Sequence, residues 1–82
     1  MNNKEVFDLV KLYFSTEFEI PEEKIIPSAS LSDDLGLDSI DALDMSGMLE
    51  AELDIEVEVD DLKRIKTVQD VINYILKNKR IT

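Results

Sequence analysis

The sequence predicts an all-α protein, a small bundle of three main helices and a minor fourth with a long first loop. Apolar residues recur at helical spacing in three separate segments of the 82-residue chain. Only one segment alternates like a β-strand, and a lone strand has no partner with which to pair. A chain of this length can build one small hydrophobic core, so we expect a single domain over residues 1–82.

The first helix is expected over residues 3–18. Its apolar stripe consists of Val6, Phe7, Val10, Tyr13, Phe14 and Phe18. Pro21 cannot lie in a helix interior, so the helix ends before it. Residues 20–34 then form a long loop, and we expect Ile25, Ile26 and Leu31 to anchor this loop in the core.

The second helix is expected to begin at Asp38 or Ser39. Asp38 is a good N-cap, and Asp41 follows three residues later, where an acid suits the helix dipole. The helix carries two apolar stripes. One contains Ala42, Met45, Leu49 and Leu53; the other contains Ile40, Leu43, Gly47 and Ala51, with Asp41, Asp44 and Glu52 between the stripes. One stripe is enough to dock the helix, so the second suggests a contact with another molecule.

The segment that alternates is LDIEVEV, residues 53–59. We expect this segment to be an extended connection that runs into a short helix near residues 60–64. The last helix follows, with Thr67 as its cap and Asp70 at the third position of a capping box. Its buried stripe is Val68, Val71, Ile72 and Ile75, and the run KNKR at residues 77–80 places positive charge at its C-terminus.

Negative charge dominates the composition. Nine basic residues against nineteen acidic ones give a net charge of −10. No Lys or Arg lies between Ile25 and Leu62, while twelve acids fall between Asp33 and Asp61. Such a surface repels nucleic acid and anionic membranes and attracts basic protein surfaces. The simpler interpretation is that the acids only keep a small domain soluble.

The residue types that are missing exclude most chemistry within the chain. Without His or Cys there is no Ser–His triad, no thiolate nucleophile and no ordinary zinc site. The lysines lie far from Ser39 in the sequence, so a Ser–Lys pair has no local support. The run Asp33-Asp34-Leu35-Gly36 lacks the alternating ligands of an EF-hand, so we expect loose divalent binding and no specific metal site. We therefore expect no enzymatic activity.

The sequence also bears on location. No apolar run approaches the roughly 18–20 residues of a membrane span, and the N-terminus lacks the order of a signal peptide. The chain has no cysteine, so it has no disulfide framework. We expect a cytoplasmic monomer without stable membrane association.

Ser39 is the residue most open to a function. It follows Gly36 at a corner between loop and helix, where backbone N–H groups suit a phosphate. This position favours a hydroxyl that another enzyme modifies, or else a residue that only helps to cap the helix.

The stretch from Asp34 to Asp41, DLGLDSID, resembles the modification motif D-L-G-x-D-S-L-D of acyl carrier proteins. The resemblance extends over the whole chain without insertions. It includes Ala29-Ser30-Leu31, residues 50–53, Ile65-Lys66-Thr67-Val68-Gln69-Asp70 and Asn73-Tyr74-Ile75.

The resemblance implies a carrier that holds acyl intermediates as thioesters. Ser39 would receive a 4′-phosphopantetheine arm from coenzyme A, installed by a magnesium-dependent phosphopantetheinyl transferase. The imported thiol would explain why the chain needs no cysteine. The residues implied in docking to basic patches on partner enzymes are Asp38, Ile40, Asp41, Leu43, Asp44, Gly47, Glu50 and Glu52. Those implied in lining the core for the acyl chain are Met45, Leu49 and Leu53.

Three positions depart from the family pattern. Gly47 and Ser46 stand where the family usually has larger or apolar residues, and Glu58 stands where it often has proline. They bear on which enzymes the carrier serves. Fatty-acid synthesis is the first expectation, a specialised lipid or polyketide pathway the second, and a carrier for D-alanine or amino acids the third. A different class also stays open: an unmodified acidic adaptor that uses the same fold only for docking.

Overall fold

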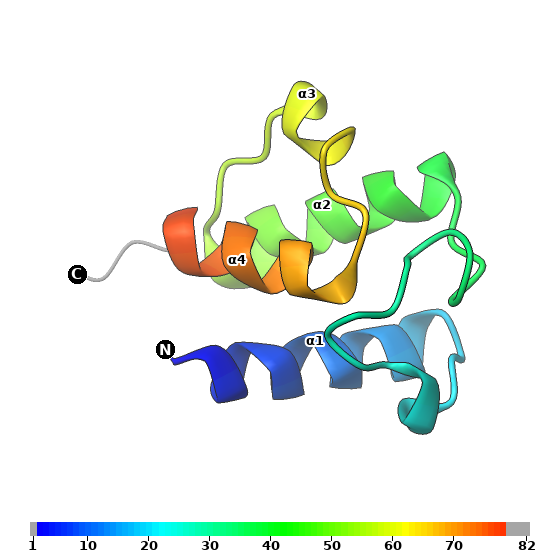
Figure 1. Ribbon diagram of the computed structural model, residues 1–82. Helices are drawn as coiled ribbons and strands as arrows, with labels where there is room; N and C mark the ends of the chain where they lie inside the picture. The colour runs from blue at the N-terminus through cyan, green and yellow to red at the C-terminus, as the bar shows by residue number, and fades with distance from the viewer. Residues whose placement is uncertain (1, 79–82) are drawn as a thin grey trace.

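The computed structural model describes residues 2–78, and within them it contains helices and no β-strand. The helices are α1 (Asn3–Glu17), the short 3-10 helix η1 (Glu22–Lys24), α2 (Ser39–Leu53), α3 (Val59–Leu62) and α4 (Val68–Asn78). Figure 1 shows α1 running opposite to α2 and α4, with α3 set to one side. The predicted fold class, three main helices with a minor fourth, is confirmed.

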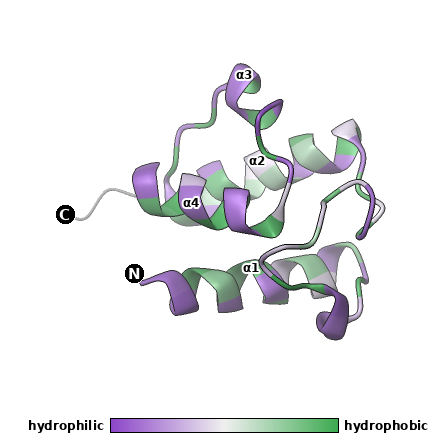
Figure 2. Cartoon of the chain, viewed as in Figure 1, coloured by the Kyte–Doolittle hydropathy of each residue, from purple (hydrophilic) through white to green (hydrophobic). Residues whose placement is uncertain are grey.

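One apolar core joins the three long helices. The stripe of α1 supplies Val6, Val10 and Phe14, and α4 packs directly against it. α2 adds Met45, Leu49 and Leu53, and α4 adds the four residues expected of it: Val68, Val71, Ile72 and Ile75. Figure 2 shows apolar residues on the helix faces that turn toward one another. Each large buried side chain contributes about 1.5–3 kcal/mol to folding.

The long first loop is anchored as predicted at one isoleucine and not at the other. Ile25 is buried, whereas Ile26 is 50% exposed, so the expectation that both enter the core is wrong. Consecutive residues in an extended backbone point to opposite sides, so only one of the two can face inward. Leu31 is half-buried, and the sequence did not predict that Ala29 and Leu35 would be buried.

The loop is also tied to the start of α4. The amide of Leu31 donates to the carbonyl of Lys66 at 2.9 Å, and the amide of Val68 donates to the carbonyl of Ala29 at 3.1 Å. These bonds surround an isolated bridge between Ser30 and Thr67. The loop is thereby held beside the N-terminal end of α4.

The connection between α2 and α3 is shorter than predicted: it spans residues 54–58, without helix or strand, because Leu53 still belongs to α2 and Val59 already belongs to α3. Asp54 adopts a left-handed conformation with φ of +54° and ends α2, a role that Asp fills more readily than bulkier residues. Ile55 is buried and Val57 is half-buried, so the alternating pattern reports burial without strand pairing. The short helix α3 then begins at Val59.

α4 begins with the predicted capping box. The amide of Asp70 donates to Thr67 Oγ1 at 3.1 Å, and the amide of Thr67 donates to Asp70 Oδ2 at 3.1 Å. Lys77 lies in the last turn, as expected. Lys79 and Arg80 lie outside the described residues.

Candidate functional site

Ser39 is the first residue of α2 and its side chain is exposed. Gly36 turns the chain just before it with φ of +69°, a conformation that residues with a side chain rarely adopt. Within residues 2–78 the Ser39 hydroxyl makes no hydrogen bond. The hydroxyl is therefore free to react, and the helix holds its position.

The capping box at this corner explains that rigidity. Asp38 Oδ1 accepts from the amides of Ile40 and Asp41, both at 3.0 Å. Asp41 Oδ2 accepts in return from the amide of Asp38 at 3.1 Å. The two carboxylates thus cap α2 as the sequence predicts, and the same bonds hold both of them close to Ser39.

A groove of about 430 Å³ opens beside Ser39. Its apolar lining comes from Phe18, Leu31, Leu37, Ala42, Met45 and Ile65. Lys63 and Lys66 line it too, together with Asp33. The sequence places these lysines far from Ser39; only the packing of α3 and α4 beside α2 brings them to the same groove.

The two predicted stripes of α2 have opposite environments. Met45, Leu49 and Leu53 are buried. On the other stripe Ile40 is 66% and Leu43 is 58% exposed, and Gly47 and Ala51 are exposed as well. No atom lies within 4 Å of the position that a Cβ on Gly47 would occupy. The second stripe is therefore an open apolar surface, as the pattern predicted.

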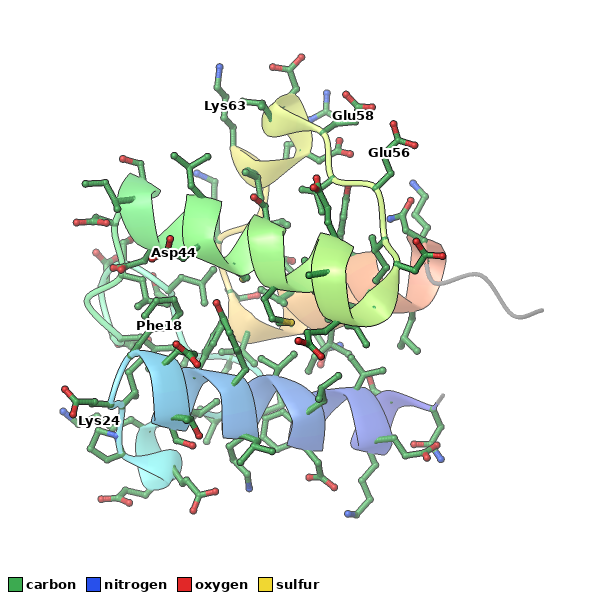
Figure 3. All side chains as sticks on the ribbon, turned by 180° about the vertical axis from the view of Figure 1, so that it is seen from behind. Phe18, Lys24, Asp44, Glu56, Glu58 and Lys63 are labelled. Carbon is green, nitrogen blue, oxygen red and sulfur yellow. The ribbon has the colours of Figure 1, made fainter. Side chains whose placement is uncertain are left out.

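Acidic side chains border this surface. Asp38, Asp44, Glu50 and Glu52 are exposed and Asp41 is half-buried. Asp41, Asp44 and Glu52 line a cleft toward α1, which also includes Tyr13, Glu17, Phe18 and Met48. Figure 3 shows Asp44 on the edge of α2 that faces Phe18.

The hydroxyl of Tyr13 lies in that cleft and joins two helices. It donates to the backbone carbonyl of Asp44 at 3.2 Å, which ties α1 to α2. Burial raises the pKa of Tyr13 above 10.0, and the carboxylates of Glu17, Asp44 and Asp41 raise this pKa further.

Clusters of metal ligands and helices that could span a membrane are absent from the described part of the chain. Residues 2–78 contain no group of three or more His, Cys, Asp or Glu side chains arranged to hold a metal ion. No described helix is both long enough and apolar enough to cross a bilayer. That the chain lacks a specific metal site stays a prediction.

Comparisons with known proteins identify the class. The family described as the phosphopantetheine attachment site matches residues 8–75. An acyl carrier protein from Thermosynechococcus vestitus is 35% identical over 75 residues, which cover 92% of this chain and 93% of that protein. Another, from Thermotoga maritima, is 37% identical over 76 residues, 93% of this chain and 94% of that protein.

Solved structures agree. The acyl carrier protein from Enterococcus faecalis superposes with a TM-score of 0.78 at 31% identity, covering 95% of this chain and 99% of that one. The crystal structure of an acyl carrier protein from Thermotoga maritima gives a TM-score of 0.83 at 24% identity, covering 95% of this chain and 91% of that one, and supports the fold alone.

Fold and family match together define a carrier domain that bears a phosphopantetheine group. The chain belongs to the acyl carrier protein family. This confirms the resemblance drawn from the motif, and with it 4′-phosphopantetheine as the cofactor. Acyl carrier proteins are non-catalytic, so the chain is a carrier and not an enzyme.

Proposed function

We propose that Ser39 bears the 4′-phosphopantetheine and that the chain presents acyl groups to the enzymes of fatty-acid biosynthesis. The observation that supports this most directly is the Ser39 hydroxyl itself. It is exposed, makes no hydrogen bond within residues 2–78, is positioned by a capping box, and lines a groove of about 430 Å³.

The residues around Ser39 fit the group. When the arm is attached, its phosphate is a diester on Ser39 Oγ, and its terminal thiol carries acyl groups as thioesters. The apolar lining of the groove, including Phe18, Leu37 and Met45, can contact an uncharged arm. Further along the same face, Leu49 and Leu53 form the part of the core that an acyl chain would enter.

Attachment requires a partner enzyme. The Ser39 oxygen forms a bond to the phosphorus that bears the pantetheine of coenzyme A, and the nucleotide part of coenzyme A leaves. Residues 2–78 place no His, Cys or paired base on the Ser39 hydroxyl, so the serine proton goes to a base on a phosphopantetheinyl transferase. The chain contributes the oriented hydroxyl and the surface that the transferase binds.

Partner enzymes dock on the exposed stripe of α2. Ile40 and Leu43 are its apolar centre, and Gly47 leaves room for a partner side chain. The acids that surround the stripe are Asp38, Asp41, Asp44, Glu50 and Glu52, and they match basic patches on those enzymes. Such pairing gives fast and weak association.

The finer predictions stand beside this proposal. One carrier domain over residues 1–82 is supported by the single core shared by residues 2–78. A cytoplasmic location and a monomeric state stay predictions from composition. The pathway served could instead be a specialised lipid or polyketide pathway, and the cargo could be D-alanine or amino acids; these stay alternatives.

One experiment separates the carrier from an adaptor that uses the fold only for docking. The protein is incubated with coenzyme A, Mg²⁺ and a phosphopantetheinyl transferase, and its intact mass is measured. We expect the mass to rise by one phosphopantetheine group. A thiol-reactive label should then bind the modified protein, although it cannot react with the cysteine-free chain alone. An unchanged mass, with a known acyl carrier protein modified in the same mixture, would favour the adaptor.

A further inference from the structure

Two lysines reach the groove beside Ser39. Lys63 follows α3 and Lys66 precedes α4, and both line the groove together with Ser39. They are among the first cations after a stretch from Ile25 to Leu62 that has none. A negative group on Ser39 would therefore meet positive charge on this side.

Two carboxylates next to Ser39 would repel a phosphate attached to it. Asp38 and Asp41 are held at the N-terminal end of α2, next to Ser39, by their hydrogen bonds to backbone amides. A phosphodiester on Ser39 adds a negative charge beside them, and like charges at short range repel. Asp38 and Asp41 line the groove as well, so a phosphate on Ser39 needs a cation to offset their charge, and Lys63 and Lys66 are the groove-lining residues that can supply one.

Both lysines are available for such a contact. Lys63 Nζ lies 3.9 Å from Asp60 Oδ1, with 77% of its side chain exposed, which makes a weak ion pair. Figure 3 shows Lys63 reaching outward from α3, so its long stem can turn. The Lys66 side chain has no ion pair within residues 2–78.

The backbone of Lys66 is fixed by two hydrogen bonds. Its amide donates to Asp70 Oδ2 at 3.0 Å, and its carbonyl accepts from the amide of Leu31 at 2.9 Å. The backbone is held on both sides while the ammonium is free. Asp33, Asp38 and Asp41 line the same groove and compete with a phosphate for that ammonium.

We propose that Lys66, assisted by Lys63, binds the phosphodiester that joins the arm to Ser39 and so directs the arm along the groove. A charge-assisted hydrogen bond of this kind is stronger than a neutral one. The arm is thereby kept off the exposed stripe of α2 until a partner with its own basic patch competes for the phosphate. This inference rests on the proposed attachment at Ser39.

The test uses phosphorus NMR of the modified protein. The ³¹P resonance of the arm is followed from low to high NaCl concentration in four proteins: wild type, Lys66→Gln, the double variant Lys63→Gln/Lys66→Gln, and Lys24→Gln. Lys24 lies in η1 and does not line the groove, so its variant is the control for losing one positive charge. Thermal melts confirm that each variant is folded.

In wild type we expect the resonance to shift as salt screens the contact. In the double variant the ³¹P chemical shift at low salt should already equal the value that wild type reaches at high salt. Lys66→Gln should give an intermediate shift at low salt. Lys24→Gln should behave like wild type. Identical shifts and salt responses in all four proteins would overturn the proposal. A failure of attachment itself would show earlier, in the intact mass, and would count against the proposed function instead.

Discussion

At Asp38 the capping role and the charge can be separated. Its Oδ1 accepts two amide hydrogen bonds, and asparagine offers the same oxygen without the charge. Asp38→Asn should therefore change the free energy of unfolding little, whereas Asp38→Ala should lower it by about 0.5–2 kcal/mol. Urea denaturation measures both. Equal losses in the two variants would mean that the negative charge, and not the cap, stabilises α2.

Single residues also show which predictions a sequence can support. The motif places Ser39 and its capping acids correctly because their hydrogen bonds are all between neighbours in the chain. Ile26 was wrongly assigned to the core, since composition cannot tell which of two consecutive isoleucines turns inward. Lys66 beside Ser39 could not be predicted, because that proximity depends on how α4 and the loop before it pack.

For the single helix α2, docking can be tested by changing its acidic residues and, separately, its exposed apolar residues. Asp38 and Asp41 are needed as caps, so Asp44 and Glu50 are the acids to reverse. The variant Asp44→Lys/Glu50→Lys should associate more slowly with a basic transferase at low salt, and its rate should depend less on salt. The variant Glu22→Lys/Glu23→Lys in η1 makes the same change in net charge away from α2. Similar slowing in both variants would show that only total charge matters.

The apolar centre of that surface has its own expected signature. Leu43→Asp should act mainly on dissociation and weaken the complex roughly 5–30-fold, which corresponds to about 1–2 kcal/mol. Leu43 is 58% exposed, so the fold should be retained. Stopped-flow binding separates the two rates. A loss confined to the association rate would contradict an apolar contact at Leu43.

Tyr74 connects α3 to α4. The Tyr74 hydroxyl donates to Asp61 Oδ2 at 3.0 Å and accepts from the amide of Glu58 at 3.4 Å, so it ties both ends of this four-residue helix to α4. Burial is the main reason that the pKa of Tyr74 is raised above 10.0, and Asp61 raises it further. Sequence patterns predict a helix near this point; they do not show what holds it.

Tyr74→Phe should free α3 and change the response to alkali. We expect a loss of about 1 kcal/mol at neutral pH and faster amide exchange in α3. Because the folded pKa lies above the unfolded one, the neutral hydroxyl stabilises the fold fully below pH 10.0, and this stability is lost as pH rises above that value. The variant should lose less stability in that alkaline range than wild type. A steeper alkaline loss in the variant would contradict this assignment.

For the whole molecule, the net charge predicts self-repulsion between carboxylates. The net charge is −10, and residues 2–78 contain two ion pairs, Lys4 with Asp8 and Lys63 with Asp60, both on exposed side chains. Added NaCl should therefore raise the melting temperature by screening repulsion, and Mg²⁺ should do so at lower concentration. Glu56→Gln/Glu58→Gln removes two charges that project from the outer edge in Figure 3 and should respond less to salt. A melting temperature that falls with salt would contradict the expectation.

The fold as a whole was largely predictable, because three amphipathic stripes in a chain of this length leave few other arrangements. The connection from α2 to α3 was harder. Its alternating residues satisfy the local pattern of a strand, and only the absence of a pairing partner argued for the extended segment that is observed. The groove at Ser39 was not predictable, since it is formed by residues from the first loop, α2 and the segment before α4.

The central claim is that Ser39, and no other hydroxyl, bears the arm. The direct measurement is peptide mapping by mass spectrometry of protein modified with coenzyme A and a transferase. We expect the added group on the peptide that contains Ser39, with Ser28, Ser30, Ser32 and Ser46 unmodified, and we expect Ser39→Ala to fold and to gain no mass. Ser30, Ser32 and Ser46 are the sharpest internal controls: the first two line the same groove, and Ser46 lies in the same helix. Modification of any of these serines, or of the Ser39→Ala protein, would contradict the account.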